Sequence, residues 1–148
     1  MGEISRKELL LALVGAGSRP RLAGMDLSAM DLRRLDFEGA NMRGANLSAS
    51  NMQEAILRSA NLTGANMSVT QASYADFNAA NMSTVNFSGG VLRGARLSLA
   101  NLSNTVFNGA NLEGANLSGA TVTGLKFDEN TVWPDGKKGA AGNPADYI

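Results

Sequence analysis

The sequence predicts an all-β solenoid, a rod built by winding the chain into stacked coils. Large apolar residues recur at every fifth position from Leu22 to Val132 without an insertion, and Ala72 is the one small residue in this register. A small residue often lies two positions before the large one, and Gly often lies two positions after it. A period of five fits neither a helix nor a half-buried strand. It is typical of a solenoid in which one large and one small side chain per unit point inward.

The composition agrees with one folded domain and excludes most enzyme chemistry. The chain has 148 residues, 44% of them hydrophobic, and 13 basic side chains balance 13 acidic ones. It has no Cys and no His, which excludes disulfides, thiolate nucleophiles, imidazole bases and the usual zinc ligands. No apolar run reaches the roughly 18 residues of a membrane span. We therefore expect a cytoplasmic protein with no enzyme activity and no cofactor.

Residues 1–19 predict a capping helix followed by a linker. Ser5 and Glu8 form a capping box in front of an apolar stretch that Gly15 or Gly17 can end. The alternative is a signal peptide with a basic start and small residues at a cleavage site, which would export the protein. The apolar stretch is at the short limit for a signal peptide, so we favour the helix.

The repeated units carry a specific signature. The units at 40–44 (Ala-Asn-Met-Arg-Gly) and 110–114 (Ala-Asn-Leu-Glu-Gly) resemble the Ala-(Asn/Asp)-Leu-x-x signature of pentapeptide repeat proteins, and the resemblance covers residues 20–132. It implies a right-handed quadrilateral β-helix of about six coils, with four units to a coil and the central Leu, Met or Phe inside. Some units lack the expected Asn or Asp at the second position: Ile56, Val91, Arg96, Val106 and Lys126.

Charged residues test the four-sided coil within the sequence. In a coil of four units, residues n and n+20 are stacked about 4.8 Å apart, so charges at this offset should be opposite. Between residues 21 and 132 all such pairs are opposite in sign, whereas offsets of three or five units give more like-charged pairs than opposite ones. The pairs are Arg34 with Glu54, Glu38 with Arg58, Asp76 with Arg96, and Arg93 with Glu113.

The same stacking predicts two columns of equivalent residues. Phe87, Phe107 and Phe127 share an inward column, so three rings should stack near the carboxyl end. The outward column that begins at Asn41 and Asn61 should form amide hydrogen bonds up the stack. Both columns are predicted to be structural.

Residues 133–148 predict a carboxyl-terminal cap and tail. The stretch Trp-Pro-Asp-Gly at 133–136 resembles one that often follows the last repeat of pentapeptide repeat proteins. The resemblance implies that Trp133 covers the last coil, where Pro134 cannot continue the ladder. The segment Gly139–Ile148 is predicted to be mobile or loosely docked.

Candidate metal and nucleic-acid sites are weak. Asp26, Asp31 and Asp36 look like an acidic cluster, but steps of five place them on three different sides of one coil, so we predict no metal site. The arginines of the repeats are spread over three sides, and no aromatic ladder lies between them. This pattern disfavours nucleic-acid binding.

One side combines residue types that dominate protein interfaces. Tyr74 is the only Tyr or Trp in the repeats, and a four-unit coil places it with several arginines. Since Tyr and Arg are enriched among binding hot spots, we predict a protein interface here. The alternative is that Tyr74 only fills space beside Ala72 and that the arginines only solubilise the rod. The candidate interface residues are Arg33, Arg34, Gln53, Glu54, Tyr74 and Arg93.

These observations predict a noncatalytic binding or scaffold protein whose partner is another protein rather than a nucleic acid or a membrane. Whether it is a monomer or a homodimer stays open. The alternative comes from the resemblance, because some pentapeptide repeat proteins mimic DNA with strongly negative surfaces, bind DNA gyrase and confer resistance to quinolones. The zero net charge argues against this alternative, and so does Asp76, the only acidic residue between residues 55 and 112.

Overall fold

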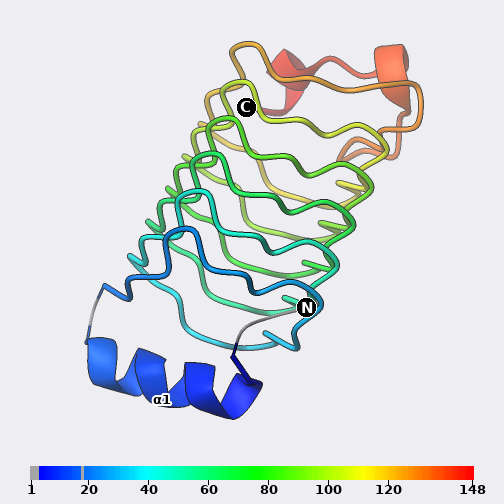
Figure 1. Cartoon of the computed structure of the whole chain (residues 1–148). Helices are drawn as coiled ribbons and strands as arrows, with labels where there is room; N and C mark the ends of the chain where they lie inside the picture. Colours follow the sequence, from blue (N-terminus) through cyan, green and yellow to red (C-terminus); the bar gives the residue numbers. More distant parts are fainter. Residues whose placement is uncertain (1–3, 18) are drawn as a thin grey trace.

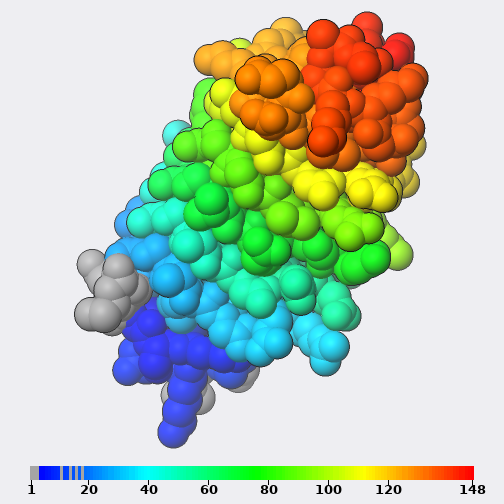
Figure 2. Space-filling model, turned by 90° about the vertical axis from the view of Figure 1, so that its right-hand side faces the viewer, coloured from blue at the N-terminus to red at the C-terminus, as the bar shows by residue number. Residues whose placement is uncertain are grey.

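A stack of square coils makes up most of the molecule, with a helix at one end and a short irregular segment at the other (Figure 1). The computed structural model describes residues 4–17 and 19–148. Helix α1 spans Arg6–Ala16, and two short 3-10 helices, η1 (Gly139–Ala141) and η2 (Pro144–Tyr147), lie in the carboxyl-terminal segment. Successive coils follow the sequence order along the rod, from the blue amino-terminal end to the red carboxyl-terminal end (Figure 2).

Each regular coil takes four units, and each of its four sides contributes one parallel β-bridge. Arg21 is bridged to Asn41 and Asn41 to Asn61, and the same offset is kept on the other three sides. The Leu22 N–H donates to the C=O of Asn41 at 2.7 Å, which is typical of the bonds that join the coils. The four-unit coil predicted from the charge pattern is therefore the coil that forms. Because each side is so short, the described residues form isolated bridges rather than continuous strands.

The corners are tight turns that require a positive φ. In the first of them, the Met25 N–H donates to the C=O of Leu22 at 3.2 Å, and Gly24 between them has a φ of 68°. Glycine adopts this conformation at no steric cost, which explains its place two positions after the large apolar residue. Other residues take the same corner position with positive φ: Ala29, Arg34, Ala49, Glu54, Ser59, Val69, Tyr74, Ala79, Thr84, Leu99 and Asn104.

Val69→Gly is expected to stabilise the fold. Val69 is β-branched with a φ of 48°, and its side chain is 54% exposed. Relief of this strain outweighs the entropy cost of Gly, so the free energy of unfolding should rise by about 0.5–1 kcal/mol in urea denaturation. Gly44→Val is the reverse control, because Gly44 also has a positive φ and open space where a Cβ atom would lie. We expect Gly44→Val to lower the free energy of unfolding. A loss of stability in Val69→Gly would contradict the strain argument.

The Asn or Asp of each signature holds the corner that follows it. The Oδ1 atom of Asn61 accepts from the N–H of Thr63 at 3.1 Å and from its hydroxyl at 2.7 Å. Asn41 accepts from the N–H of Arg43 in the same way, at 3.3 Å. The prediction that these amides bond up the stack is therefore wrong, because the acceptor oxygen is used within its own unit. This local bond explains why the signature needs a short side chain with an acceptor oxygen.

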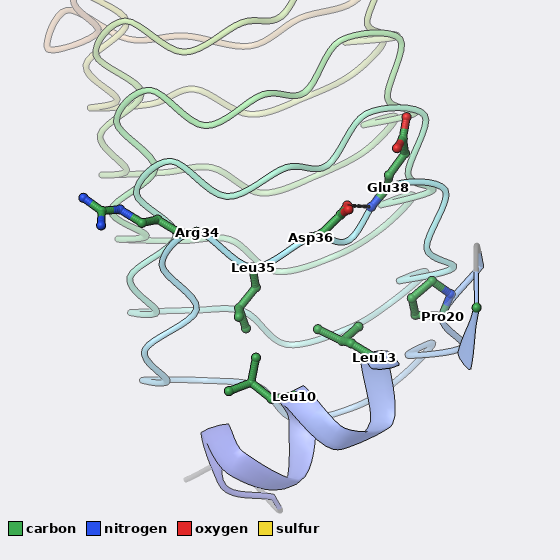
Figure 3. A pocket seen from close by; sticks show the side chains of 8 residues that line it. Leu10, Leu13, Pro20, Arg34, Leu35, Asp36 and Glu38 are labelled. Carbon is green, nitrogen blue, oxygen red and sulfur yellow. Dashed lines mark hydrogen bonds between the residues drawn. The ribbon is translucent and has the colours of Figure 1, made fainter. Parts of the chain in front are cut away.

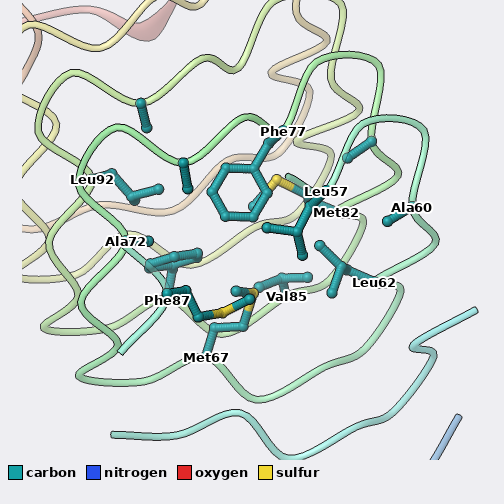
Figure 4. Packing of buried hydrophobic residues seen from close by; sticks show 14 of the residues in the cluster. Leu57, Ala60, Leu62, Met67, Ala72, Phe77, Met82, Val85, Phe87 and Leu92 are labelled. Atoms are coloured by element: carbon teal, nitrogen blue, oxygen red, sulfur yellow. The ribbon is translucent and has the colours of Figure 1, made fainter. Parts of the chain in front are cut away.

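Large and small side chains of successive units fill the interior of the rod (Figure 4). The rings of Phe77 and Phe87 meet edge to face with centroids 6.2 Å apart, and those of Phe87 and Phe107 lie 6.0 Å apart. Phe127 instead packs on Trp133, with centroids 5.1 Å apart. The predicted column of three rings is thus wrong at Phe127, and Phe77 supplies the third ring from the opposite side of the coil.

The five-residue register shifts by one residue near the carboxyl end. Asn111 is bridged to Val132, one position beyond the regular offset, so the unit that begins at Lys126 holds one extra residue. Trp133 is fully buried and occupies the inward position, whereas Val132 is only half-buried. The prediction of an unbroken register to Val132 is therefore wrong.

Polar bonds accommodate the extra residue. The Asp128 carboxylate accepts from the N–H of Gly109 at 2.9 Å, where a backbone carbonyl would accept in a regular coil. This bond, the largest influence, holds the pKa of Asp128 below its ordinary value. Thr131 is fully buried in the small-residue position, and its hydroxyl donates to the C=O of Phe107 at 2.7 Å. The backbone N–H of Gly109 and the C=O of Phe107 thus keep hydrogen-bond partners although the unit is longer.

The carboxyl-terminal segment is packed on Trp133. The indole Nε1–H donates to the C=O of Gly139 at 2.8 Å, and the ring stacks on Tyr147 with centroids 5.6 Å apart and an interplanar angle of 13°. A Cβ atom on Gly142 would lie 2.2 Å from the indole Cδ1, so the backbone there rests directly on the ring. The prediction that Gly139–Ile148 is mobile or loosely docked is wrong, because a large aromatic surface holds this segment.

Tyr147 is expected to titrate at unusually high pH. Burial and a 2.9 Å hydrogen bond to the Asp135 carboxylate raise the pKa of Tyr147 to about 12. This pKa exceeds the ordinary value of about 10. The contribution of the Tyr147 hydroxyl to the free energy of unfolding is therefore fully present below about pH 10 and is lost as the pH rises through about 12. In Tyr74→Phe, Tyr147 is the only tyrosine, and its tyrosinate absorbance should appear near pH 12. A midpoint near pH 10 would contradict the packing of this segment.

Helix α1 lies across the open face of the first coil (Figure 1). The predicted capping box forms, since the Ser5 hydroxyl oxygen accepts from the Glu8 N–H and the Glu8 carboxylate accepts from the Ser5 N–H, each at 3.1 Å. Leu9 is fully buried against the core of the coils. The Arg6 guanidinium donates to the C=O of Arg33 at 3.0 Å and to the C=O of Asp31. Both apolar and polar contacts therefore hold α1 on the rod.

Candidate functional site

The predicted interface residues lie along one edge of the rod. Bridges from Asp31 to Asn51, Asn51 to Gln71 and Gln71 to Val91 stack this side in steps of one coil, and the corner that follows each bridge belongs to the edge. We call this edge, made of residues 33–34, 53–54, 73–74 and 93–94, the Tyr74 edge. It contains all six candidates: Arg33, Arg34, Gln53, Glu54, Tyr74 and Arg93.

Tyr74 presents a flat aromatic surface at the middle of this edge. Its side chain is 68% exposed, so the alternative that it fills space beside the fully buried Ala72 is wrong. A Cβ atom on Gly94 would lie 2.4 Å from the ring Cε1, which shows that the ring rests on the backbone of the next coil. One face of the ring is thus supported by Gly94, and much of the rest is exposed.

The arginines of the edge are paired with carboxylates. Arg34 lies 3.4 Å from Glu54, as predicted from the stacking offset, and the two side chains are largely exposed. Arg33 instead pairs with Asp31 in its own unit, at 2.9 Å. The side-chain hydrogen bonds from Arg33, followed by the bond from its backbone N–H, hold the pKa of Asp31 well below its ordinary value. Exposed pairs of this kind contribute little to stability.

Arg93 lies 3.7 Å from Glu113, again at the predicted offset. The amino-terminal part of the edge also borders a hollow of about 300 Å³, to which α1 contributes Arg6. The other residues that line this hollow are Arg33, Arg34, Gln53 and Glu54. Sequence reasoning missed Arg6, because its place depends on how the helix lies on the rod.

Residues on the adjacent side extend the site beyond the predicted set. A hollow of about 490 Å³ lies beside Tyr74, and Ile56, Asp76 and Arg96 line it. Ile56 and Arg96 occupy the signature position that is usually Asn or Asp, so they give up the hydrogen bond that holds the corner. The missing Asn or Asp at residues 56 and 96 was visible in the sequence, but the sequence did not indicate that these residues lie beside Tyr74.

Asp76 is paired differently from the prediction. Its carboxylate lies 3.5 Å from the guanidinium of Arg58 rather than in an ion pair with Arg96, although Asp76 and Arg96 are stacked by a bridge. Asp76 also accepts from the N–H of Asn78 at 3.0 Å, which turns the carboxylate toward its own corner. In the part of the chain that the structure describes, Arg96 has no carboxylate partner. The hollow therefore combines apolar surface with an available positive charge.

A third hollow lies between α1 and the first coil. Leu10 and Leu13 of the helix face Leu35 across a cavity of about 420 Å³ (Figure 3). Leu10 is 39% exposed there. This hollow lies under the amino-terminal helix and meets the Tyr74 edge only at Arg34.

The acidic residues of the first coil do not converge. Asp26, Asp31 and Asp36 lie on successive sides, and each carboxylate accepts from the backbone N–H two residues later. Among residues 4–17 and 19–148, no three acidic side chains gather in a way that could hold a metal ion. Within the same ranges, no helix has the length and apolar character of a membrane span.

Comparison with known proteins identifies the repeat. The family model for pentapeptide repeats matches residues 19–48, 50–89 and 91–124, in eight copies. The chain belongs to the pentapeptide repeat family. The matched region ends at residue 124, before the longer unit that begins at Lys126. Membership in this family confirms the resemblance seen in the sequence and implies the right-handed winding of the coils.

Solved pentapeptide repeat proteins resemble this one in fold. The crystal structure of Rfr23, a pentapeptide repeat protein from the cyanobacterium Cyanothece 51142, is 27% identical, with a TM-score of 0.77 over 84% of this chain and 99% of that chain. A pentapeptide repeat protein from the Arabidopsis thaliana thylakoid lumen is 35% identical, with a TM-score of 0.54 over 67% of this chain and 65% of that chain. A search of curated proteins found no match.

A fluoroquinolone resistance protein is also among the similar structures. QnrB1, described as plasmid-mediated, is 21% identical over 76% of this chain and 83% of that chain, with a TM-score of 0.37. Similarity at this level carries no argument about the function of this pentapeptide repeat protein.

Proposed function

We propose that this pentapeptide repeat protein is a noncatalytic binding module of the cytoplasm that engages another protein through the Tyr74 edge and the hollow beside it. The observation that carries the proposal is the exposed ring of Tyr74, supported on one face by Gly94. The ring is already held in place, so binding would cost little side-chain entropy. Aromatic anchors of this kind supply much of the energy of protein interfaces.

The surroundings of the ring favour a protein partner over a small molecule. The adjacent hollow is open and joins apolar atoms of Ile56 to the guanidinium of Arg96. Along the edge, the exposed pairs Arg34–Glu54 and Arg93–Glu113 form a polar rim. An apolar centre with a polar rim is the usual composition of a protein–protein interface.

The proposal predicts that Tyr74→Ala abolishes capture of the partner and that Arg93→Ala weakens it. Pull-downs from a lysate of the natural host, followed by mass spectrometry, would compare these variants with the parent. Leu99→Ala is the matched control, because Leu99 is 64% exposed, has the same positive φ and packs against Gly119 of the next coil on a different edge. If Tyr74→Ala and Arg93→Ala fold normally and retain every partner of the parent, the Tyr74 edge is not the interface.

The DNA-mimic alternative has less support. Its carboxylates would have to form a continuous negative surface, but Glu54, Asp76 and Glu113 each lie within ion-pair distance of an arginine. We expect no protection of DNA gyrase from a quinolone in a supercoiling assay. Protection would favour the alternative over the Tyr74 edge.

A further inference from the structure

We propose that a hollow at the start of the rod, on a different side from the Tyr74 edge, binds a small phosphate-bearing anion. This hollow, which we call the Arg21 hollow, has a volume of about 760 Å³. It is lined by Arg19, Arg21, Asn41 and Asn61 together with the small residues Ala23, Gly39 and Ala40. The inference does not depend on the proposed protein interface. It rests on the hydrogen-bonding character of the lining and on the pairing of the arginines.

The two asparagines present donors to the hollow. The Oδ1 of Asn41 accepts from the Arg43 N–H, and the Oδ1 of Asn61 accepts from both the N–H and the hydroxyl of Thr63. Because a backbone N–H can only donate, these bonds fix which end of each amide faces its corner. The Nδ2 groups, which can only donate, are the polar atoms left for the hollow.

Three backbone carbonyls at the hollow, those of Pro20, Ala40 and Asn41, are already occupied. The Pro20 C=O accepts from the Asn41 N–H at 2.8 Å, and the Ala40 C=O accepts from the Asn61 N–H at 2.9 Å. The Asn41 C=O accepts from the Leu22 N–H at 2.7 Å. The side chains of the lining therefore offer amide and guanidinium donors, and these three carbonyls are engaged in joining the coils.

The arginines of the hollow, like Arg43 and Arg96, have no carboxylate partner in the described part of the chain. No carboxylate lines the hollow, and in the described ranges Arg19 and Arg21 form no ion pair. Glu38, next to the lining residue Gly39, lies 3.9 Å from Arg58 and is directed to that partner. In contrast, each of these arginines lies within ion-pair distance of a carboxylate: Arg6, Arg33, Arg34, Arg58 and Arg93.

This arrangement matches the chemistry of a phosphate group. Guanidinium groups bind phosphate oxygens through paired N–H donors, and charge-assisted bonds of this kind are stronger than neutral ones. Two unpaired positive charges suit a doubly charged anion better than a singly charged one. The volume of the hollow is within the range of small-molecule sites, which leaves room for an organic group attached to the phosphate.

The test uses pyrophosphate as a probe, titrated into the full-length protein in an isothermal calorimeter at constant ionic strength. The decisive variant is Asn61→Asp. An Asp side chain holds the corner as Asn does, as Asp26, Asp31 and Asp36 show, yet it places a negative charge in the hollow. We expect pyrophosphate affinity to fall at least about tenfold, a change of about 1.4 kcal/mol, with the melting temperature nearly unchanged.

The matched control is Asn66→Asp. Asn66 makes the same two bonds to Ser68 that Asn61 makes to Thr63, but it lies on another side of the rod. Its variant should bind pyrophosphate as the parent does, whereas Arg21→Gln should bind more weakly. Equal weakening by Asn61→Asp and Asn66→Asp, or no saturable binding by the parent, would overturn the proposal. Citrate, a carboxylate of similar charge, should bind less tightly, and equal binding would overturn the assignment to phosphate.

Discussion

Trp133→Ala is expected to lower the free energy of unfolding by about 3–5 kcal/mol, the range for truncating a large buried aromatic residue. Trp133 is fully buried between the ring of Phe127 and that of Tyr147, and it also donates a hydrogen bond to Gly139. Its removal leaves a cavity at the end of the core and releases the carboxyl-terminal segment. Urea denaturation followed by circular dichroism would measure the loss.

Two further variants separate the contributions to this effect. Trp133→Phe keeps an aromatic ring but lacks the indole N–H, so it should cost less than Trp133→Ala. Gly142→Ala places a Cβ atom 2.2 Å from the indole, and the segment must shift to avoid the clash. We expect Gly142→Ala to destabilise the protein by about 1–3 kcal/mol. If Trp133→Ala costs less than about 1 kcal/mol, the indole does not hold the end of the rod.

Deletion of residues 1–17 is expected to lower the melting temperature and to cause association. The deletion removes the contacts of Leu9 with the core and those of Arg6 with the backbone at Asp31 and Arg33. The end of the first coil would then expose apolar side chains and unpaired backbone groups, which pair readily with other chains. Light scattering coupled to size-exclusion chromatography would report the mass.

Point variants on α1 give a sharper test. Leu9→Asp places an unpaired carboxylate in the core and should reproduce the effects of the deletion, because a buried charge without a partner is strongly unfavourable. Leu10→Asp is the matched control on the same helix, since Leu10 is 39% exposed and its variant can keep the charge in water. A truncated protein that stays monomeric with an unchanged melting temperature would show that α1 does not protect the first coil.

The regular part of the fold could be predicted because each side of a coil carries one large buried residue. The five-residue register is therefore visible in the sequence, and pairs such as Arg34–Glu54 reveal the size of the coil. The shift near the carboxyl end was hidden, because Val132 is apolar and continues the pattern by coincidence while Trp133 takes the inward place. Thr131 gave no sign of it either, because Thr70 and Thr105 are buried at the same position of regular coils.

The candidate site was predictable in position but not in detail. The offset of one coil was enough to gather the residues of the Tyr74 edge. Side-chain pairing depends on reach and local bonds that spacing does not contain, so Asp76 was assigned to Arg96 although it pairs with Arg58. The identity of an Asn also does not say which partner its oxygen accepts from. That choice is set by the corner geometry, and it decides the donor character of the Arg21 hollow.

The longer unit that begins at Lys126 separates the regular coils of the rod from its carboxyl-terminal end. Every regular coil repeats after four units, so a duplication of four whole units placed before this point would preserve the phase of all the others. Each duplication would lengthen the molecule by about 4.8 Å. After the extra residue, Trp133 takes the inward position that Leu or Phe takes in the regular coils. The five-residue register therefore does not continue beyond this point. The length of the regular stack is thus set by the number of units before Lys126, and the one added residue ends its regular register.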